Sequence, residues 1–149
     1  DSAQLFDLIS RKDSKVCDLG SGAGFPGAVL AMMGCSNMTL IERDRKKCSF
    51  LRAVSRETKT SFEVFEGDVK VYPGKADFIT SRALAPLKDL LQLSENLLTS
   101  KTTCLFLKGL RVDEELSEID PEIGMTVSKK QSITSKEGVI LELKDIVFR

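Results

Sequence analysis

The 149-residue chain contains no histidine, and its four cysteines form no C-x-x-C pair. Metal sites in proteins draw on clustered cysteine and histidine side chains, so the sequence offers no such ligand pattern. Cys17 and Cys104 lie in apolar, strand-like runs, where a cysteine usually acts as a small buried hydrophobe. We therefore expect no metal site and interpret Cys17, Cys35, Cys48 and Cys104 as reduced, structural residues.

The chain also lacks net charge, long apolar runs and internal repeats. Lysine plus arginine and aspartate plus glutamate each number 22, which argues against a domain that grips nucleic acid by bulk electrostatics. No apolar run approaches the roughly 20 residues that span a bilayer, and the mixed N-terminal segment has no signal-peptide pattern. We expect one cytoplasmic domain over residues 1–149, without a membrane segment and monomeric.

Charge is nevertheless concentrated in two segments. Residues 42–47, ERDRKK, are locally basic, and residues 113–122 are rich in acids. The acidic segment is expected to face solvent. A charged run that opens an amphipathic helix is usually its solvated face, so we assign no individual role to the basic side chains, although the run could face an anionic partner.

Strand-like runs alternate with helical patterns along most of the chain. The expected strands are residues 15–19, 37–42, 61–65, 76–81 and 102–107, and the expected helices are 4–9, 26–33, 45–58, 87–98 and 114–119. Asp44 is the expected N-cap of the third helix. Residues 125–131 and 138–147 are expected to form an antiparallel pair. This pattern predicts an α/β fold: a doubly wound, Rossmann-like, mostly parallel seven-stranded sheet that binds ligands at the carboxyl ends of its strands.

The segment VCDLGSGAGFPGAVLA, residues 16–31, has the order strand, glycine-rich turn, helix. Its GAGFPG part satisfies the G-x-G-x-x-G pattern of dinucleotide-binding loops, and Glu42 follows at the end of the next strand. The same segment also satisfies the acid-then-glycine pattern of S-adenosylmethionine-dependent methyltransferases. In either case glycines let the backbone approach the ligand, and a carboxylate such as Glu42 accepts hydrogen bonds from ribose hydroxyls. The residues of the second pattern are Asp18, Gly20, Gly22 and Gly24.

Three features favour S-adenosyl-L-methionine over a dinucleotide such as NAD. The acid ahead of the glycines, Asp18, suits the ammonium and sulfonium of S-adenosylmethionine better than it suits a pyrophosphate. Pro26 removes a backbone N–H at the helix start that a pyrophosphate would use. Glu66-Gly-Asp68 follows the third strand, where methyltransferases place residues that pocket the adenine. We therefore predict S-adenosyl-L-methionine as the cofactor, with an NAD-binding dehydrogenase as the alternative.

Four segments, DLGSGAGFPG, LIERDRKKCSFL, ITSRALAPL and CLFLKG, resemble in that order the glucose-inhibited division protein B family, also called GidB or RsmG. The Phe-Pro-Gly end of the loop and the Ser-Arg-Ala of residues 81–83 are the discriminating pieces. The resemblance covers essentially the whole chain and is weakest over residues 113–133. It implies a class I S-adenosylmethionine-dependent methyltransferase that modifies N7 of a guanine in 16S ribosomal RNA of the small ribosomal subunit.

The resemblance also implies roles for individual residues. The cofactor residues are Gly20, Phe25, Glu42 at the ribose, and Asp68, Val69 and Lys70 at the adenine; Arg82 is the catalytic residue and borders cofactor and RNA, and Lys108 meets RNA. Family members carry additional N-terminal helices that lead into a His-x-x-Asp-Ser-type segment, whereas this sequence begins with Asp1-Ser2. We expect this departure to bear on RNA binding and on closure of the cofactor site rather than on the fold.

The expected chemistry is compatible with the lack of histidine. Guanine N7 has a free lone pair and no proton to lose, so in-line methyl transfer needs alignment more than a base. The planar Arg82 side chain could hold a phosphate or the guanine edge; the alternative is a salt bridge to Asp77 or Asp89. Phe25 could pack beside the cofactor or fill the core. For the whole chain, the alternatives are methyl transfer to a small molecule or protein, and a cofactor-binding module without catalysis.

Overall fold

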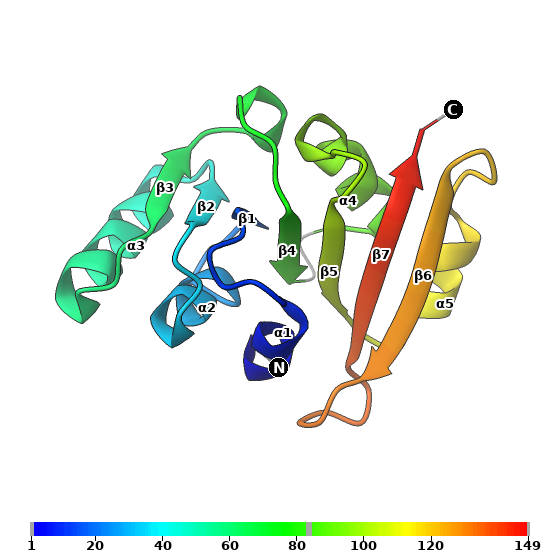
Figure 1. The fold of residues 1–149 in the computed structure, drawn as a ribbon, viewed down its shortest axis with the longest axis horizontal. Helices are drawn as coiled ribbons and strands as arrows, with labels where there is room; N and C mark the ends of the chain where they lie inside the picture. Colours follow the sequence, from blue (N-terminus) through cyan, green and yellow to red (C-terminus); the bar gives the residue numbers. More distant parts are fainter. Residues whose placement is uncertain (1, 83–84, 149) are drawn as a thin grey trace.

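The computed structural model describes residues 2–82 and 85–148 and places them in a seven-stranded sheet with helices on both faces (Figure 1). The strand order is β3-β2-β1-β4-β5-β7-β6. Strands β1 to β5 run parallel, and β7 is antiparallel to both of its neighbours, β5 and β6. The predicted fold class is therefore confirmed. The strands are β1 Val16–Leu19, β2 Met38–Glu42, β3 Glu63–Glu66, β4 Phe78–Arg82, β5 Thr103–Lys108, β6 Gly124–Gln131 and β7 Val139–Val147.

The helices follow the predicted order with shifted ends. They are α1 Ser2–Leu8, α2 Gly27–Met33, α3 Arg45–Thr58, α4 Leu87–Ser94 and α5 Val112–Ser117, with 3-10 turns η1 Val69–Val71 and η2 Glu95–Leu97. The helix expected over residues 87–98 is α-helical only to Ser94 and then tightens into η2. Asp1 of the Asp-Ser pair and Ala83 of the Ser-Arg-Ala motif lie outside the described residues.

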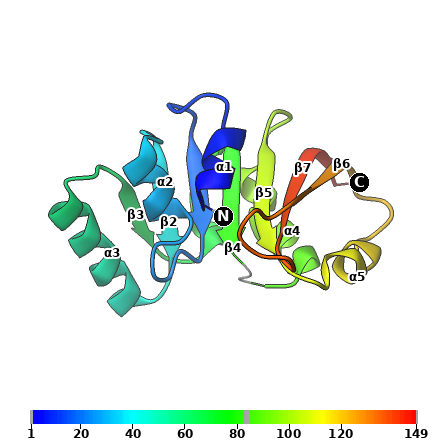
Figure 2. The same cartoon turned by 90° about the horizontal axis from the view of Figure 1, so that it is seen from below.

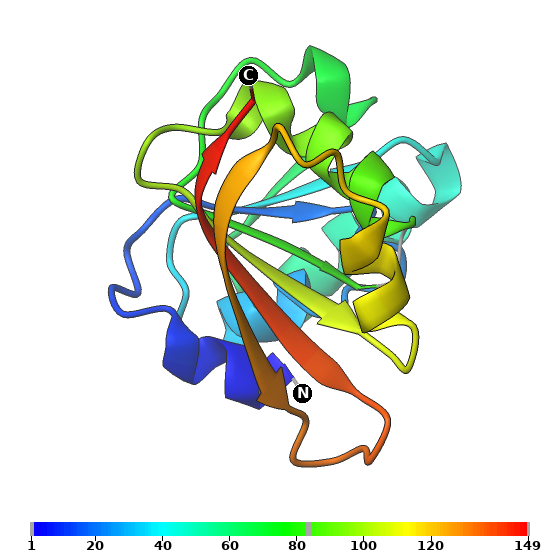
Figure 3. The same cartoon turned by 90° about the vertical axis from the view of Figure 1, so that its right-hand side faces the viewer.

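Two apolar layers hold the helices on the sheet. Helices α1, α2 and α3 pack on one face through a cluster that includes Leu5, Leu30 and Leu51. Helices α4 and α5 cover the other face together with η2 (Figures 2 and 3). Strand residues alternate between the two layers: in β5, Cys104 and Phe106 join one cluster, while Leu105 joins the other. Because successive side chains point to opposite faces, the nearly continuous apolar run of this strand predicts burial on both faces, as β5 shows.

Helix α3 begins where its sequence predicts. The Asp44 carboxylate accepts a hydrogen bond from the Lys47 N–H at 2.9 Å, which satisfies one of the free donors of the first turn. Cys48 and Leu51 point into the core, and Phe50 on the opposite face stays 52% exposed. The buried face of α3 thus packs against the end of β2, and its basic first turn faces solvent.

The sheet changes winding direction between β1 and β4. From β1 the chain crosses to β2 and β3 on one side, and β4 then lies on the other side of β1. Leu19 and Ser81 are register partners, so the loop after β1 begins beside Arg82, the last residue of β4. Ligands of open α/β sheets bind at such a switch point, outside the carboxyl ends of the strands.

The remaining predictions on burial are largely confirmed. All four cysteines are buried and free of disulfides. The acidic segment around α5 is mostly exposed, but Glu115 is half-buried because it bonds inward. Within residues 2–82 and 85–148, no helix is long and apolar enough to cross a membrane.

Gly27, the first residue of α2, packs directly against β1. A Cβ atom at this position would lie 2.6 Å from Asp18 Oδ2 and 2.7 Å from Asp18 Cβ, and would also meet the Leu40 side chain. Real Cβ atoms do not approach this closely, so α2 sits on β1 and β2 at a distance that only glycine allows. This contact fixes the height of the helix, and of the loop before it, above the sheet.

We expect Gly27→Ala to lower the free energy of unfolding by about 1–3 kcal/mol, because the added methyl overpacks the interface with β1. Urea denaturation followed by circular dichroism measures the change. Gly109→Ala is the matched control, since a Cβ there would meet no atom within 4 Å. An unfolding midpoint of Gly27→Ala equal to that of the unsubstituted chain would contradict the close contact.

Candidate functional site

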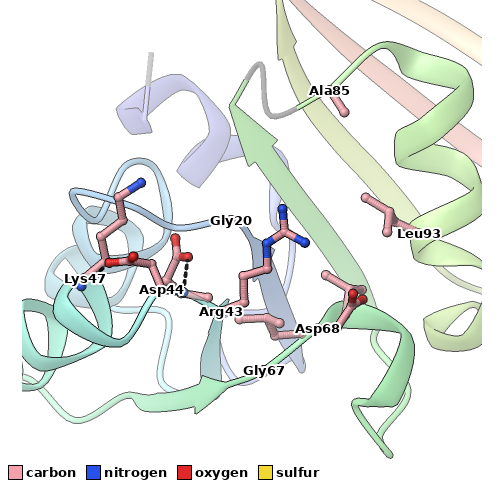
Figure 4. Close-up of a pocket in the computed structure, with 11 residues that line it drawn as sticks. Gly20, Arg43, Asp44, Lys47, Gly67, Asp68, Ala85 and Leu93 are labelled. Atoms are coloured by element: carbon pink, nitrogen blue, oxygen red, sulfur yellow. Dashed lines mark hydrogen bonds between the residues drawn. The ribbon is translucent and has the colours of Figure 1, made fainter.

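A cavity of about 380 Å³, here called the strand-end cavity, opens at the carboxyl ends of β1, β2 and β3 (Figure 4). It combines a polar rim with apolar walls. Ala85 and Leu93, from the α4 side, face the ends of β2 and β3 across it. Its lining residues are Gly20, Ile41, Glu42, Arg43, Asp44, Lys47, Gly67, Asp68, Val69, Ala85 and Leu93.

Glu42 ends β2 and supplies the buried carboxylate of this cavity. Its side chain is held on both oxygens by backbone donors: Gly22 N–H donates to Oε1 at 3.0 Å, and Asp44 N–H donates to Oε2 at 2.9 Å. The residue is only 7% exposed, so the carboxylate has little freedom to reorient. Each oxygen retains acceptor capacity, which suits it to receive hydroxyl groups of a ligand in the cavity.

The loop after β1 is built from glycines in left-handed conformations. Gly20, Gly22 and Gly24 have φ values of 61°, 51° and 98°, which residues with a Cβ rarely adopt. Gly20 lines the strand-end cavity, while Gly22 and Ala23 lie beside Lys46, Lys47 and Phe50 in a shallow neighbouring pocket. Gly24 lines neither, and is enclosed near Ala28 and Leu51. Of the three predicted glycines, the structure therefore brings Gly20 alone to the cavity that holds Glu42.

Asp18 lies behind this loop rather than in the cavity. It is fully buried, and its carboxylate accepts from Thr80 Oγ1 at 2.6 Å and from Ser21 Oγ at 2.7 Å. Burial raises the pKa of Asp18 to about 6, while the hydrogen bonds from Thr80, Ser21 and the Gly27 N–H act in the opposite direction. The sequence predicted a direct cofactor contact; in the structure this carboxylate instead supports the loop from below.

The turn after β3 forms the floor of the strand-end cavity. Val69 is buried and lines it, and the Asp68 carboxylate accepts from the Lys70 N–H at 2.9 Å. Asn96 Nδ2, from η2, donates to the Val69 and Tyr72 carbonyls at 3.2 and 3.1 Å. The predicted Asp68 and Val69 thus reach the cavity, whereas Lys70 is exposed and does not line it.

A second cavity, of about 370 Å³ and here called the arginine cavity, lies at the end of β4. The Arg82 guanidinium carbon lies 6.0 Å from the centre of the Phe25 ring. Phe25 is 49% exposed, so the alternative that it fills the core is wrong. Arg82 forms no salt bridge within the described chain, and Asp77 instead accepts from the Lys15 N–H. Its lining residues are Ser2, Ala3, Phe25, Val29, Arg82 and Leu107.

Lys108 points inward from the end of β5, contrary to the expectation of an RNA contact. Its side chain is 5% exposed, and its Nζ donates to Glu115 Oε1 at 2.8 Å and to the Ala85 carbonyl at 2.9 Å. Both acceptors are part of the protein. In this conformation the ammonium group is not available to a phosphate.

Sequence reasoning assigned no role to several residues that line or support the strand-end cavity. Arg43 directly follows Glu42, and its place at a strand end was a signal that could have identified it. Ala85 lies in the ITSRALAPL segment, but the resemblance gave it no role. Leu93 carries no sequence signal, because only the return of the chain over the sheet brings it opposite β2. Asn96 likewise acts through a contact distant in sequence. The described residues contain no group of three acidic, histidine or cysteine side chains placed to hold a metal ion.

The pKa of Asp18 makes a prediction about stability and pH. In the unfolded chain the carboxyl ionises near pH 4, whereas in the folded chain it does so at about 6. Between these values the native state retains a proton that the unfolded state has lost, so the free energy of unfolding falls as pH rises. Ionisation of buried Asp18 thus lowers the free energy of unfolding by about 2–3 kcal/mol, and this loss is complete above pH 6. Urea denaturation of the unsubstituted chain and of Asp18→Asn from pH 4 to 7 measures it as a changing difference; parallel curves would refute it.

Three comparisons place the chain among known proteins. A ribosomal RNA small subunit methyltransferase G from Paramagnetospirillum magneticum is 44% identical over 147 residues, which cover 98% of this chain and 72% of that protein. A ribosomal protein L11 methylase from Lactobacillus delbrueckii subsp. bulgaricus superposes with a TM-score of 0.75 at 14% identity, over 97% of this chain and 76% of that one. MtNAS in complex with S-adenosylmethionine superposes with a TM-score of 0.72 at 16% identity, over 96% and 61%.

The two solved structures support the fold alone, because their sequence identities are low. The family assignment rests on sequence: the model of the GidB family, described as rRNA small subunit methyltransferase G, matches residues 1–144. This match and the identity to the Paramagnetospirillum protein confirm the resemblance seen in the four motif segments. The chain belongs to the GidB family.

Proposed function

We propose that this chain is an S-adenosyl-L-methionine-dependent methyltransferase that acts on N7 of a guanine in 16S ribosomal RNA of the small ribosomal subunit. The observation that carries the cofactor is the Glu42 carboxylate, held by two backbone N–H groups at the end of β2 and beside the glycine loop. The names of the family and of its relative support the RNA substrate. The proposal includes a monomer that works in the cytoplasm.

The strand-end cavity fits the parts of S-adenosylmethionine in order. Glu42 would accept hydrogen bonds from the ribose hydroxyls, and the apolar side chains of Ile41, Val69 and Leu93 would contact the adenine faces. Gly20, at the start of the loop, would let the methionine part lie close to the backbone. A cavity of about 380 Å³ lies within the usual range for small-molecule sites.

The arginine cavity adjoins the same loop and suits the acceptor base. The Phe25 ring offers a half-exposed aromatic face for stacking, and Arg82 offers guanidinium donors without a competing carboxylate in the described chain. An arginine usually addresses both O6 and N7 of guanine. Because N7 must stay free to accept the methyl group, we assign the Arg82 donors to O6 or to a neighbouring phosphate.

This reaction places few chemical demands on the residues of the site. When bound, S-adenosylmethionine would supply a methyl group on a sulfonium. The guanine N7 lone pair would form the new bond as the carbon–sulfur bond breaks, which leaves S-adenosylhomocysteine and a positive charge on the base, and no proton is lost. The protein must therefore align the two groups and limit their motion rather than provide a base. Arg82 and Phe25 would fix the plane of the base, while Glu42 and the glycine loop would fix the donor on the other side of the switch point.

Transfer of a labelled methyl group to small ribosomal subunits that lack the modification tests the function. Label recovered as N7-methylguanosine in 16S RNA supports it. Label in proteins or small molecules alone would contradict the substrate. Binding of S-adenosylhomocysteine without transfer would identify a cofactor-binding module without catalysis. Binding of NAD in place of S-adenosylhomocysteine would overturn the methyltransferase proposal.

We expect Glu42→Gln to weaken S-adenosylhomocysteine binding by about 10- to 100-fold, because a hydrogen bond to a charged acceptor is worth about 1.5–3 kcal/mol. Titration calorimetry measures the dissociation constant. Glu66→Gln is the matched control: Glu66 ends the adjacent strand β3, pairs with Arg52 and does not line the cavity. An equal loss of affinity in both variants would show that the effect comes from the change in total charge and not from the cavity carboxylate.

We expect Arg82→Met to reduce the rate of methyl transfer by about 10²-fold or more while changing S-adenosylhomocysteine affinity little, because it removes the group that aligns the acceptor. Single-turnover transfer to unmodified subunits, at saturating cofactor, measures the rate. Arg111→Met provides the control, since Arg111 is exposed and pairs only with Glu114 among the described acids. An unchanged transfer rate in Arg82→Met would remove Arg82 from the acceptor site.

A further inference from the structure

The ion pair between Lys108 and Glu115 is the most buried of those in the described chain. The two side chains are 5% and 19% exposed, whereas the partners in the Arg111–Glu114 pair of the same region are 79% and 66% exposed. Lys108 lies at the end of β5, and Glu115 lies in α5, seven positions later. A buried lysine is costly unless its charge is compensated and its N–H groups are bonded, so its partners indicate what it does.

These partners form a network that reaches the chain after β4. Lys108 Nζ donates to the Ala85 carbonyl at 2.9 Å as well as to Glu115 Oε1 at 2.8 Å. Glu115 Oε1 also accepts from the Leu87 N–H at 2.9 Å. Leu87 is the first residue of α4, and its N–H has no partner inside the helix. Lys108 and Glu115 together therefore hold the backbone at both Ala85 and Leu87.

The backbone that they hold is the far wall of the strand-end cavity. Ala85 lines this cavity, and α4 brings Leu93 to it; both face the ends of β2 and β3 (Figure 4). The cofactor pattern of the glycine loop contributes no residue to this wall. The position of this wall depends on where α4 begins, and the bonds from Lys108 and Glu115 to Ala85 and Leu87 fix that point.

We propose that Lys108 and Glu115 are positioning residues for the cofactor: the pair fixes the wall formed by Ala85 and α4, and so sets the affinity of the strand-end cavity for the nucleoside part. This inference rests on the proposed cofactor, and it gives Lys108 a role inside the protein in place of an RNA contact. Neither residue touches the cofactor, and both act through the backbone of Ala85 and Leu87.

The two roles for Lys108 predict different effects of substituting Lys108 and its partner Glu115. If the pair positions the wall, Lys108→Met and Glu115→Gln both weaken S-adenosylhomocysteine binding, by roughly tenfold, and the double variant is no worse than the more impaired single one. If Lys108 instead contacts RNA, Lys108→Met leaves this affinity unchanged and raises KM for the ribosomal subunit. Glu115→Gln would then lower that KM, because it removes a negative charge beside the phosphate.

Titration calorimetry with S-adenosylhomocysteine and steady-state transfer to unmodified subunits measure these quantities. We expect a weaker dissociation constant at an unchanged binding stoichiometry, and a raised KM for S-adenosylmethionine at a kcat within about twofold of the unsubstituted value. Partial unfolding would lower the stoichiometry instead, and would count against a positioning role. The control is Lys129→Met, which breaks the exposed pair between Lys129 of β6 and Asp113 of α5 and should leave affinity unchanged.

Amide hydrogen exchange at Leu87 tests the network independently of any ligand. Its N–H should be protected in the unsubstituted chain, exchange at least about tenfold faster in Lys108→Met, and stay protected in Lys129→Met. Equal protection in all three would overturn the proposal. If the unsubstituted chain fails to bind S-adenosylhomocysteine, the proposed cofactor is wrong. Faster exchange at Leu87 in Lys108→Met would still show that the network supports α4. Unchanged exchange in that variant would refute this support as well.

Discussion

The buried carboxylate of Asp18 is the interaction on which the rest of the site depends. It takes hydrogen bonds from Ser21 in the loop, from Thr80 in β4 and from the Gly27 N–H at the start of α2, so one side chain joins three segments that meet at the switch point of the sheet. Burial of an acid is unfavourable, as its raised pKa reflects, and the donors compensate only part of that cost. The loop geometry is therefore obtained at the expense of stability above pH 6.

Glu42 depends on that loop in turn. Gly22 can donate to Glu42 only while the loop keeps its left-handed glycines, and the Glu42 carbonyl meanwhile accepts from Gly67 N–H at 3.0 Å at the end of β3. The acid that would bind ribose is thus fixed from β1 on one side and from the β3 turn on the other. Sites whose groups are held by backbone donors lose little freedom when a ligand arrives, which favours affinity.

The fold and one half of the site could be predicted from sequence, because their signals are local. Alternating apolar runs predict the strands, and acid and glycine spacing predicts the loop and Glu42. The family resemblance implies the turn at Asp68 and Val69. The other half could not, because contacts between distant segments bring Ala85 and Leu93 to the cavity and bring Asn96 to the backbone of the turn after β3. Asp18 and Lys108 show a further limit: their chemistry suggests contact with a ligand, and only burial shows that their bonds are used within the protein.

The zero net charge is compatible with an anionic substrate because the charges are separated in space. Four basic residues at the start of α3 and just before it are exposed, and none of them forms a salt bridge in the described ranges: Arg43, Arg45, Lys46 and Lys47. Of these, Arg43 and Lys47 line the strand-end cavity. The acids of α5 lie toward the opposite end of the sheet, where Arg111, Lys129 and Lys108 pair with them (Figure 1). The cavity is also lined by the carboxylates of Glu42, Asp44 and Asp68, so cations and acids are mixed at its mouth. An RNA partner would meet this local distribution of charge, so the zero total charge of the chain does not by itself exclude such a partner.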